Sequence, residues 1–390
     1  MTQAISTLDM IGRLVGFDTT SRESNLALIG FVRDYLDGFG IASELVFDDE
    51  RRKANLFATI GPDDHGGIML SGHTDVVPVD GQIWASDPFT VAMRDDRLYG
   101  RGTADMKGFI AAALALVPEF IAAKAPTPVH LALTYDEEVG CLGVRGLIAR
   151  LGTRPVKPRL CIIGEPTLMQ PVVAHKGKKS VRCHVRGHES HSALAHLGVN
   201  AIEAGATIIA RIREMAQDKR DHGPYDPGFS PPYTTIHTGT VAGGTALNIV
   251  PRECRFAFEI RYLPEDDPDA MFAALRHHAD MLVADMHRVS PATGIEFDAY
   301  NAIPALSTAA DSEVVQLAQS LTGANSVGKV SFGTEGGLYQ QAGIPTVICG
   351  PGSIEQAHRP DEYLALDQLR QCETFLRRLI ARLGKDGSGA

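Results

Sequence analysis

Residues 68–75 read Ile-Met-Leu-Ser-Gly-His-Thr-Asp, an apolar run that ends in a histidine and, two residues later, an aspartate. This pattern predicts a buried strand that ends at the edge of a sheet. Because side chains alternate along a strand, His73 and Asp75 would point the same way. A neutral imidazole binds divalent transition metals, and a nearby carboxylate can hold its ring in one tautomer. The segment alone fits either a metal ligand or a histidine that is merely hydrogen-bonded at a strand end.

Composition narrows the class of protein around this segment. The chain has 390 residues, enough for two or three domains, with 44% hydrophobic and 22% charged residues, the balance of a globular protein with a sizeable core. The net charge of −10 argues against a nucleic-acid partner, because such proteins carry basic patches. No apolar run approaches the ~20 residues that cross a bilayer, and no signal peptide is evident, so we expect neither membrane nor export.

The spacing of the cysteines indicates the cellular compartment of the protein. The chain has 6 cysteines, and none forms a CxxC pair. Such scattered cysteines predict reduced, mostly buried thiols in a cytoplasmic protein. They are Cys141, Cys161, Cys183, Cys254, Cys349 and Cys372.

Apolar strands alternate with helical segments on both sides of residues 68–75. Strands are predicted at 55–60, 68–70, 129–134 and 160–163, and helices at 6–16, 25–39 and 108–124. This alternation predicts an α/β domain with a mainly parallel sheet and helices on both faces. Ligands bind beyond the carboxyl ends of the strands in such sheets. The side chains at these ends therefore belong to one predicted site: His73, Glu137, Glu138 and Glu165.

The pattern changes after about Lys178. Residues 180–186 alternate apolar with polar side chains, as a half-exposed strand does. The segments that follow are a helix at 198–215, strands at 234–241 and 255–262, a helix at 271–286 and a strand at 295–297. This order predicts an inserted α+β domain with a four-stranded sheet and two helices. The predicted domains are 1–178 and 299–390 for the main domain and 179–298 for the insertion.

The candidate ligands share a chemistry. They are His73, Asp105, Glu138, Glu165 and His358. Imidazole nitrogens and carboxylate oxygens without thiolate suit zinc, cobalt or manganese. Asp105 also precedes a helix, so a helix cap is its alternative role. Glu137 and Glu138 are adjacent and would point apart in extended chain, so one can bind metal while the other acts as a general base; a solvated acidic turn is the alternative.

Five motifs, taken together and in order, resemble the di-zinc deacylase and carboxypeptidase family. They are residues 73–75 (HTD), 102–108 (GTADMKG), 136–140 (DEEVG), 164–166 (GEP) and the late His358. The resemblance implies His73 and Glu165 on one ion, Glu138 and His358 on the other, and Asp105 as the bridge. It also implies Glu137 as the base that activates a water between the ions, and Asp75 as the partner of His73.

The same resemblance implies that the insertion is a lid and homodimerisation domain. Residues 187–193 (GHESHSA) are similar to the family stretch whose histidine reaches the partner's active site and stabilises the tetrahedral oxyanion. Ser-Ala after His191 favours that residue, although His188 lies only three positions away. Asn248 and Arg261 match family positions that bind substrate, and Arg261 can offer a fork to a carboxylate; a plain surface arginine is the alternative.

Within the family, residues 331–337 (SFGTEGG) and 349–363 are most similar to the acetylornithine deacetylases. The resemblance implies hydrolysis of N2-acetylornithine, a small molecule, to ornithine and acetate. Another N-acyl amino acid, such as succinyl-diaminopimelate, or a dipeptide is the alternative substrate, and a non-catalytic metal-binding module is a third reading. Glu335, in the glycine-rich loop, is either the partner of the substrate ammonium or a residue that supports the site or caps the loop.

Overall fold

The structure is a computed structural model that describes residues 3–385, and the chain forms two compact units. The first unit holds the described residues up to Ala174, Leu306–Gly328 and those from Thr334 on, and the second holds His175–Ala305 and Lys329–Gly333. The insertion is thus a few residues longer at each end than the predicted 179–298. The reason is that its strands continue past the visible alternation, from Gly177 in β9 to Ile303 in β12.

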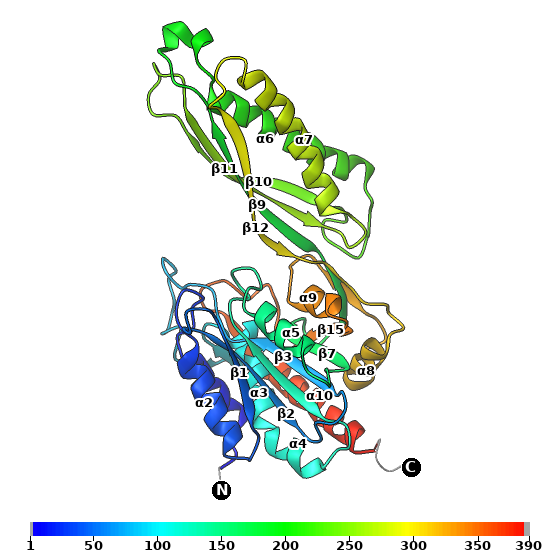
Figure 1. Cartoon of the computed structure of the whole chain (residues 1–390). Helices are drawn as coiled ribbons and strands as arrows, with labels where there is room; N and C mark the ends of the chain where they lie inside the picture. The colour runs from blue at the N-terminus through cyan, green and yellow to red at the C-terminus, as the bar shows by residue number, and fades with distance from the viewer. Residues whose placement is uncertain (1–2, 386–390) are drawn as a thin grey trace. The chain divides into compact units, whose positions relative to one another are not determined.

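A mixed sheet forms the centre of the first unit (Figure 1). It has nine strands in the order β1-β2-β6-β3-β7-β15-β8-β13, with β14 paired to β8. The bounds are β1 Ser43–Phe47, β2 Ala54–Ile60, β3 Ile68–His73, β6 Val129–Thr134, β7 Leu160–Pro166, β8 Val172–His175, β13 Leu306–Ser307, β14 Gly328–Val330 and β15 Thr346–Gly350. The strands β6, β3, β7 and β15 are mutually parallel, whereas β1, β2 and β8 add antiparallel flanks. The predicted α/β class is confirmed, and the sheet is parallel only in its centre.

Helices cover this sheet on both faces (Figure 1). Their bounds are α1 Thr7–Val15, α2 Leu26–Asp37, α3 Gly108–Ala115, α4 Val117–Ala123, α5 Val144–Gly152, α8 Glu313–Thr322, α9 Gly336–Gln341 and α10 Leu366–Lys385. Helix α3 is apolar all round and is buried between α1, α10 and the strands β3 and β7, as its composition predicts. Just before it, the short turn η1, Thr103–Lys107, carries Asp105. A small sheet, β16-β5-β4, completes the unit with β4 Ala92–Arg94, β5 Arg97–Tyr99 and β16 Tyr363–Ala365.

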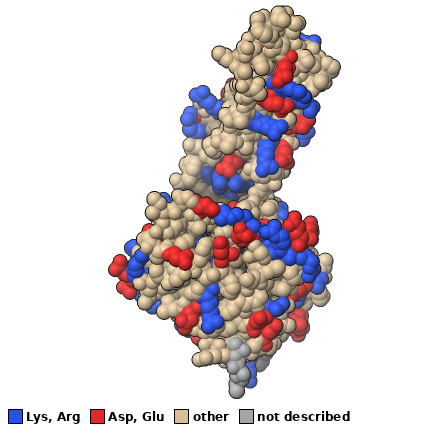
Figure 2. All heavy atoms as spheres, turned by 90° about the vertical axis from the view of Figure 1, so that its left-hand side faces the viewer, with Lys and Arg blue, Asp and Glu red and all other residues tan. Residues whose placement is uncertain are grey.

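The surface and the thiols follow the composition. On the face shown in Figure 2, basic and acidic side chains of the first unit are interspersed. All six cysteines are unpaired and buried, as predicted. Between residues 3 and 385 no single helix is long and apolar enough to span a membrane, although the bent pair Thr103–Ala115 and Val117–Ala123 reaches that length together.

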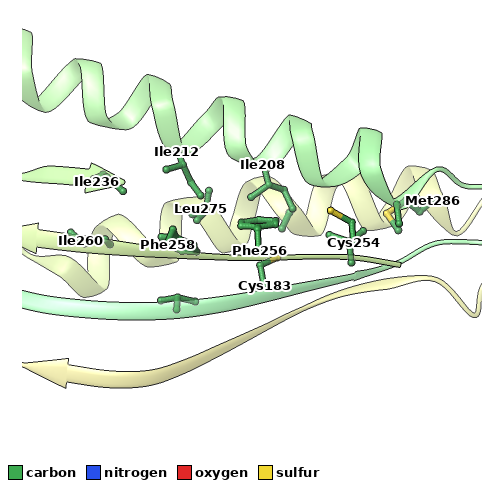
Figure 3. Close-up of a cluster of buried hydrophobic side chains, with 14 of the residues drawn as sticks. Cys183, Ile208, Ile212, Ile236, Cys254, Phe256, Phe258, Ile260, Leu275 and Met286 are labelled. Atoms are coloured by element: carbon green, nitrogen blue, oxygen red, sulfur yellow. The ribbon is translucent and has the colours of Figure 1, made fainter. Parts of the chain in front are cut away.

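The second unit is a four-stranded antiparallel sheet, β10-β11-β9-β12, with two long helices. Its elements are β9 Gly177–Arg186, the 3₁₀ turn η2 Ser192–Leu197, α6 Ala201–His222, β10 Thr235–Gly243, β11 Glu253–Tyr262, α7 Pro268–Met286 and β12 Gly294–Ile303. Figure 3 shows α6 and α7 on one face of the sheet, over a core that includes Phe256, Phe258 and Ile260. The predicted order of strands and helices is confirmed. The strands were predictable because period-two alternation of apolar and polar residues marks which side of each strand is buried.

Candidate active site

The five predicted ligands converge in the first unit, at the carboxyl ends of its central strands. His73 ends β3, Glu165 lies near the end of β7, and Glu138 follows β6. Asp105 comes from η1, and His358 lies in the loop after β15. Parallel strands bring their carboxyl ends to one edge of a sheet, which explains why ligands far apart in sequence meet.

Asp105 lies between the two histidines. Its Oδ1 is 3.0 Å from Nε2 of His73, and its Oδ2 is 3.3 Å from Nε2 of His358. A glutamate approaches the same nitrogen of each ring: Glu165 Oε1 is 3.7 Å from Nε2 of His73, and Glu138 Oε2 is 3.1 Å from Nε2 of His358. The five side chains thus form two trios that share one carboxylate.

The ring of His73 is oriented for metal binding. Its Nδ1 is 2.9 Å from the backbone oxygen of Asp75. A carbonyl oxygen only accepts, so Nδ1 carries a proton, and Nε2 faces the carboxylates of Asp105 and Glu165. In the neutral ring Nε2 offers a lone pair, and a metal ion between this nitrogen and the two carboxylates fits the arrangement.

Asp75 does more than the predicted contact with the His73 ring, whose Nδ1 is 3.5 Å from its Oδ1. The two oxygens of Asp75 also accept hydrogen bonds from the backbone N–H groups of Glu137, at 3.1 Å, and Glu138, at 3.3 Å. The hydroxyl of Ser21 donates to the same carboxylate at 2.7 Å. Asp75 therefore holds the turn that presents both glutamates, whatever their side chains bind.

Glu137 and Glu138 belong to different groups of ligand atoms. Glu137 lies with His73 and Glu165, and Glu138 lies with His73 and Asp105, each group within 4.8 Å. Glu137 also accepts a hydrogen bond at 3.4 Å from the thiol of Cys141. The structure thus places Glu137 beside the ligands without giving it the contact to His358 that Glu138 makes.

The crowding of carboxylates is electrostatically costly. Burial and neighbouring carboxylates raise the pKa of Glu137 and of Glu165 well above the usual range, and burial with Asp105 raises that of Glu138 to about 7. Burial also opposes ionisation of Asp105, but hydrogen bonds from the two histidines outweigh it and lower its pKa. A buried acidic cluster is stable when cations neutralise it. The donor set, all imidazole and carboxylate, fits two divalent metal ions.

The second unit brings two of its predicted residues together. The backbone N–H of Ser192 donates to the oxygen of Asn248 at 3.0 Å, and His191 forms a β-bridge with Ile249. His191 and Asn248 are both exposed. Nδ1 of His191 accepts a hydrogen bond at 3.1 Å from the N–H of Ala193, which leaves Nε2–H free to donate. His188 is tied instead by its backbone to Val199.

Arg261 lies on β11, on the face away from the helices. Its Nε donates to Oε1 of Glu259 at 2.8 Å, and its side chain is 36% exposed. Lys178 lies opposite Arg261 on β9 and reaches Glu259 at 3.5 Å. The ion pair therefore fixes the guanidinium, whose remaining N–H groups can still donate. A surface arginine without such a partner would not be fixed in this way.

Glu335 is buried, with 2% of its surface exposed. Burial raises its pKa to about 7, against the opposing effects of the Thr134 hydroxyl and of His73. Its Oε1 has no hydrogen-bond partner among the described residues, and its side chain does not cap α9. This side chain thus makes no hydrogen bond to the start of α9.

Residues 69–382 match the model of the family described as Peptidase family M20/M25/M40. The chain belongs to this family. Similar curated M20 relatives include an acetylornithine deacetylase of Myxococcus xanthus, 37% identical over 94% of this chain and 95% of that protein. Another is the acetylornithine deacetylase of Pasteurella multocida, 34% identical over 97% and 98% of the two chains.

Solved structures agree on the M20 fold. An M20 family metallo-carboxypeptidase from Sulfolobus solfataricus superposes with a TM-score of 0.76 at 18% identity, over 97% of this chain and 99% of that one. A dinuclear metal-binding peptidase of the M20 family from Bacillus subtilis superposes with a TM-score of 0.65 at 16% identity, over 97% and 98%. At these identities the likeness concerns the fold alone.

The structure adds two residues to this M20 site that sequence reasoning missed. Ser21 holds Asp75 from 54 positions away, and Cys141 contacts Glu137. No local pattern marks Ser21, because its partner is set by tertiary packing. Cys141 follows the acidic motif directly, but a buried thiol is usually only a small apolar side chain.

Proposed function

We propose that this protein hydrolyses the amide bond of N2-acetyl-L-ornithine to L-ornithine and acetate, a reaction of arginine biosynthesis. The observation that carries the proposal is the pair of ligand trios sharing Asp105, with Glu137 beside them. A scaffold that only bound metal would need no such base. The identity to acetylornithine deacetylases over nearly the whole chain supports the choice of substrate. Reduced, buried cysteines fit a cytoplasmic location for this pathway.

Two divalent metal ions complete the proposed site. His73 and Glu165 would hold one, Glu138 and His358 the other, and Asp105 both. Zinc suits these nitrogen and oxygen donors, and cobalt is a workable substitute. When bound, the ions supply electrophilic activation of the acetyl carbonyl and of water.

The chain's own residues handle the protons and the substrate. Glu137 takes the proton of the attacking water and returns it to the leaving amine. Asp75 keeps Glu137 in place through the backbone hydrogen bond already described. Arg261 would bind the substrate carboxylate, and Asn248 would also contact the substrate. The distal ammonium of the substrate would still need a binding partner.

The proposed role of His191 is to donate Nε2–H to the oxyanion of a partner chain. The second unit exposes large apolar side chains on η2, at the start of α6, at the end of β10 and in the loop before Val250. They are Leu194, Leu197, Ile202, Val241, Leu247 and Ile249, of which Ile249 forms a β-bridge with His191. Exposed apolar side chains can mark interaction surfaces, and we assign these to contact with a second copy of the chain.

Complementation tests the homodimer. Chains carrying Glu137→Gln and chains carrying His191→Ala should each be inactive, and their mixture should regain activity, because one site of a mixed dimer has both groups intact. The measurement is deacetylase activity after the two variants are mixed and subunit exchange is shown by tagged pull-down. Mixed dimers without recovered activity would place His191 in its own chain's site or in no site. His188→Ala is the matched control. It should stay active alone, so it has no lost activity to regain on mixing.

Glu335 stays a predicted substrate contact, and its burial favours the alternative role of supporting the site. A carboxylate with 2% exposure cannot meet a substrate ammonium without rearrangement. We therefore expect Glu335→Gln to lower kcat/KM by a similar factor, about 10- to 100-fold, on acetylornithine and on acetylnorleucine, which lacks the ammonium. The readout is kcat/KM on both substrates. A loss confined to acetylornithine would show instead that Glu335 reads the ammonium.

The substrate itself is tested by a panel. The purified, metal-loaded protein should cleave acetylornithine with a higher kcat/KM than succinyl-diaminopimelate or a dipeptide series, and a chelator should abolish activity. Preference for a succinyl substrate or a dipeptide would reassign the substrate within the same chemistry. Full metal content without cleavage of any of them would favour a non-catalytic module.

A further inference from the structure

A buried ion pair joins two distant segments beneath the metal-binding cluster of the first unit. Nη1 of Arg101, before η1, donates to Oε2 of Glu362, before β16, at 2.7 Å. The two residues are 261 positions apart, and each is 1% exposed. Burying two charges has a large desolvation cost, so such a pair is weak evidence for stability alone. Its hydrogen bonds indicate another purpose.

One arm of this network ends on the backbone of Asp105. Oε1 of Glu362 accepts from the N–H of Ala104 at 2.9 Å and from that of Asp105 at 3.1 Å, and Oε2 accepts from that of Gly102 at 3.0 Å. These N–H groups need a partner because Asp105 is not helical, with φ −124° and ψ 89°. The Glu362 carboxylate thus holds the loop that aims the shared carboxylate at both histidines.

The other arm ends on the backbone of His358. Nη2 of Arg101 donates to Oε1 of Gln82 at 2.7 Å, and Nε2 of Gln82 donates to the backbone oxygen of His358 at 3.0 Å. The indole of Trp84 also donates to Oε1 of Gln82, at 3.1 Å, and lies under the Arg101 guanidinium. The His358 side chain is 51% exposed, and its φ is +64°, so packing does little to fix it.

We propose that Glu362, Arg101 and Gln82, here called the clamp, are positioning residues that set the backbones of Asp105 and His358 before metal binds. The proposal rests on the proposed two-metal site. The clamp touches neither substrate nor ligand side chains, so it acts through the loops it holds. Ligands that are already positioned bind metal more tightly, because binding does not then cost the conformational entropy of ordering their loops. Residues behind a metal's ligands typically contribute 10- to 100-fold in affinity.

The two arms predict different defects. Glu362→Gln removes the charge that gathers the loop of Asp105, which would serve both ions, so both should bind about 10- to 100-fold more weakly. Gln82→Ala cuts only the arm to His358, so one ion should bind weakly and the other normally. Zinc affinity is measured on apoprotein by competition with a chromophoric chelator. The visible spectrum of the cobalt form should change in both variants, since it reports the ligand geometry.

A matched control separates positioning from general stability. Glu44→Gln breaks an ion pair with Arg154, at 2.8 Å in the same unit, and touches no ligand loop; it should keep parental zinc affinity and cobalt spectrum. Thermal unfolding of each apoprotein shows whether the fold is intact. If Glu362→Gln fails to fold, Gln82→Ala, on a partly exposed loop, decides alone.

Two results would overturn the clamp. One is parental affinity for both ions in Glu362→Gln and Gln82→Ala, and the other is an equal loss in the Glu44→Gln control. Both leave the proposed function standing, because the parental chain would still bind two ions and cleave substrate. A parental chain that binds no divalent ion would remove the proposed function and the clamp together.

Discussion

Replacing Asp105 with alanine is expected to remove both metal ions from the protein. Its two oxygens face different histidines, at 3.0 Å and 3.3 Å, so the substitution takes one ligand from each trio. The loss of one buried negative charge also reduces the attraction of the site for divalent cations. Metal analysis of the purified variant by plasma mass spectrometry provides the measurement, and we expect activity to fall to background.

The matched control for Asp105→Ala is Glu165→Ala. Glu165 belongs to the trio of His73 alone, so its loss should weaken one ion and leave the other bound. A difference between the two variants in ions per chain would show that Asp105 serves both sites. Full metal content in Asp105→Ala would refute the bridging role.

Glu137→Gln is expected to keep both ions and lower kcat by at least ~10²-fold, the usual contribution of a general base. Glutamine has nearly the shape of glutamate but cannot take a proton from water. The loop should stay in place, because Asp75 holds the backbone N–H of residue 137 and not its side chain. Metal content and kcat, measured on the same preparation, test both halves of the prediction.

The neighbouring Asp136→Asn variant is the control for Glu137→Gln. Asp136 is also acidic and partly buried, but its carboxylate pairs with Lys53 at 2.5 Å. Its φ of 55° is a conformation that asparagine tolerates. Its kcat should change only a few-fold. A near-parental kcat in a metal-replete Glu137→Gln enzyme would move the base to another residue.

Local sequence patterns predicted the parts of this protein that depend on local physics. The alternation at 180–186 and 255–262 predicted strands with one buried face, because side chains on a strand alternate whatever its partners are. The two helices of the second unit followed from their three- and four-residue apolar spacing. The ends of the insertion were less visible, because β9 and β12 extend into segments where the alternation stops.

Strand direction at the sheet flanks was not predictable in the same way. The central strands alternate with helices, and such crossovers make neighbouring strands parallel. The strands β1 and β2 form an antiparallel pair, and β2 is antiparallel to β6, a pairing between segments about 70 residues apart. Apolar character alone does not show which way a buried strand runs.

The sequence by itself determined the class of fold, the ligand chemistry and the family, because strand ends, residue types and motif order are all local features. Tertiary structure alone decided which atoms meet. It placed the two carboxylate oxygens of Asp105 beside different histidines and buried Glu335. It also brought the carboxylate of Asp75 into a hydrogen bond with the backbone N–H of Glu137. It also joined Arg101 to Glu362 across 261 positions. Such contacts depend on how distant segments pack, and packing leaves no periodic trace in the sequence of either partner.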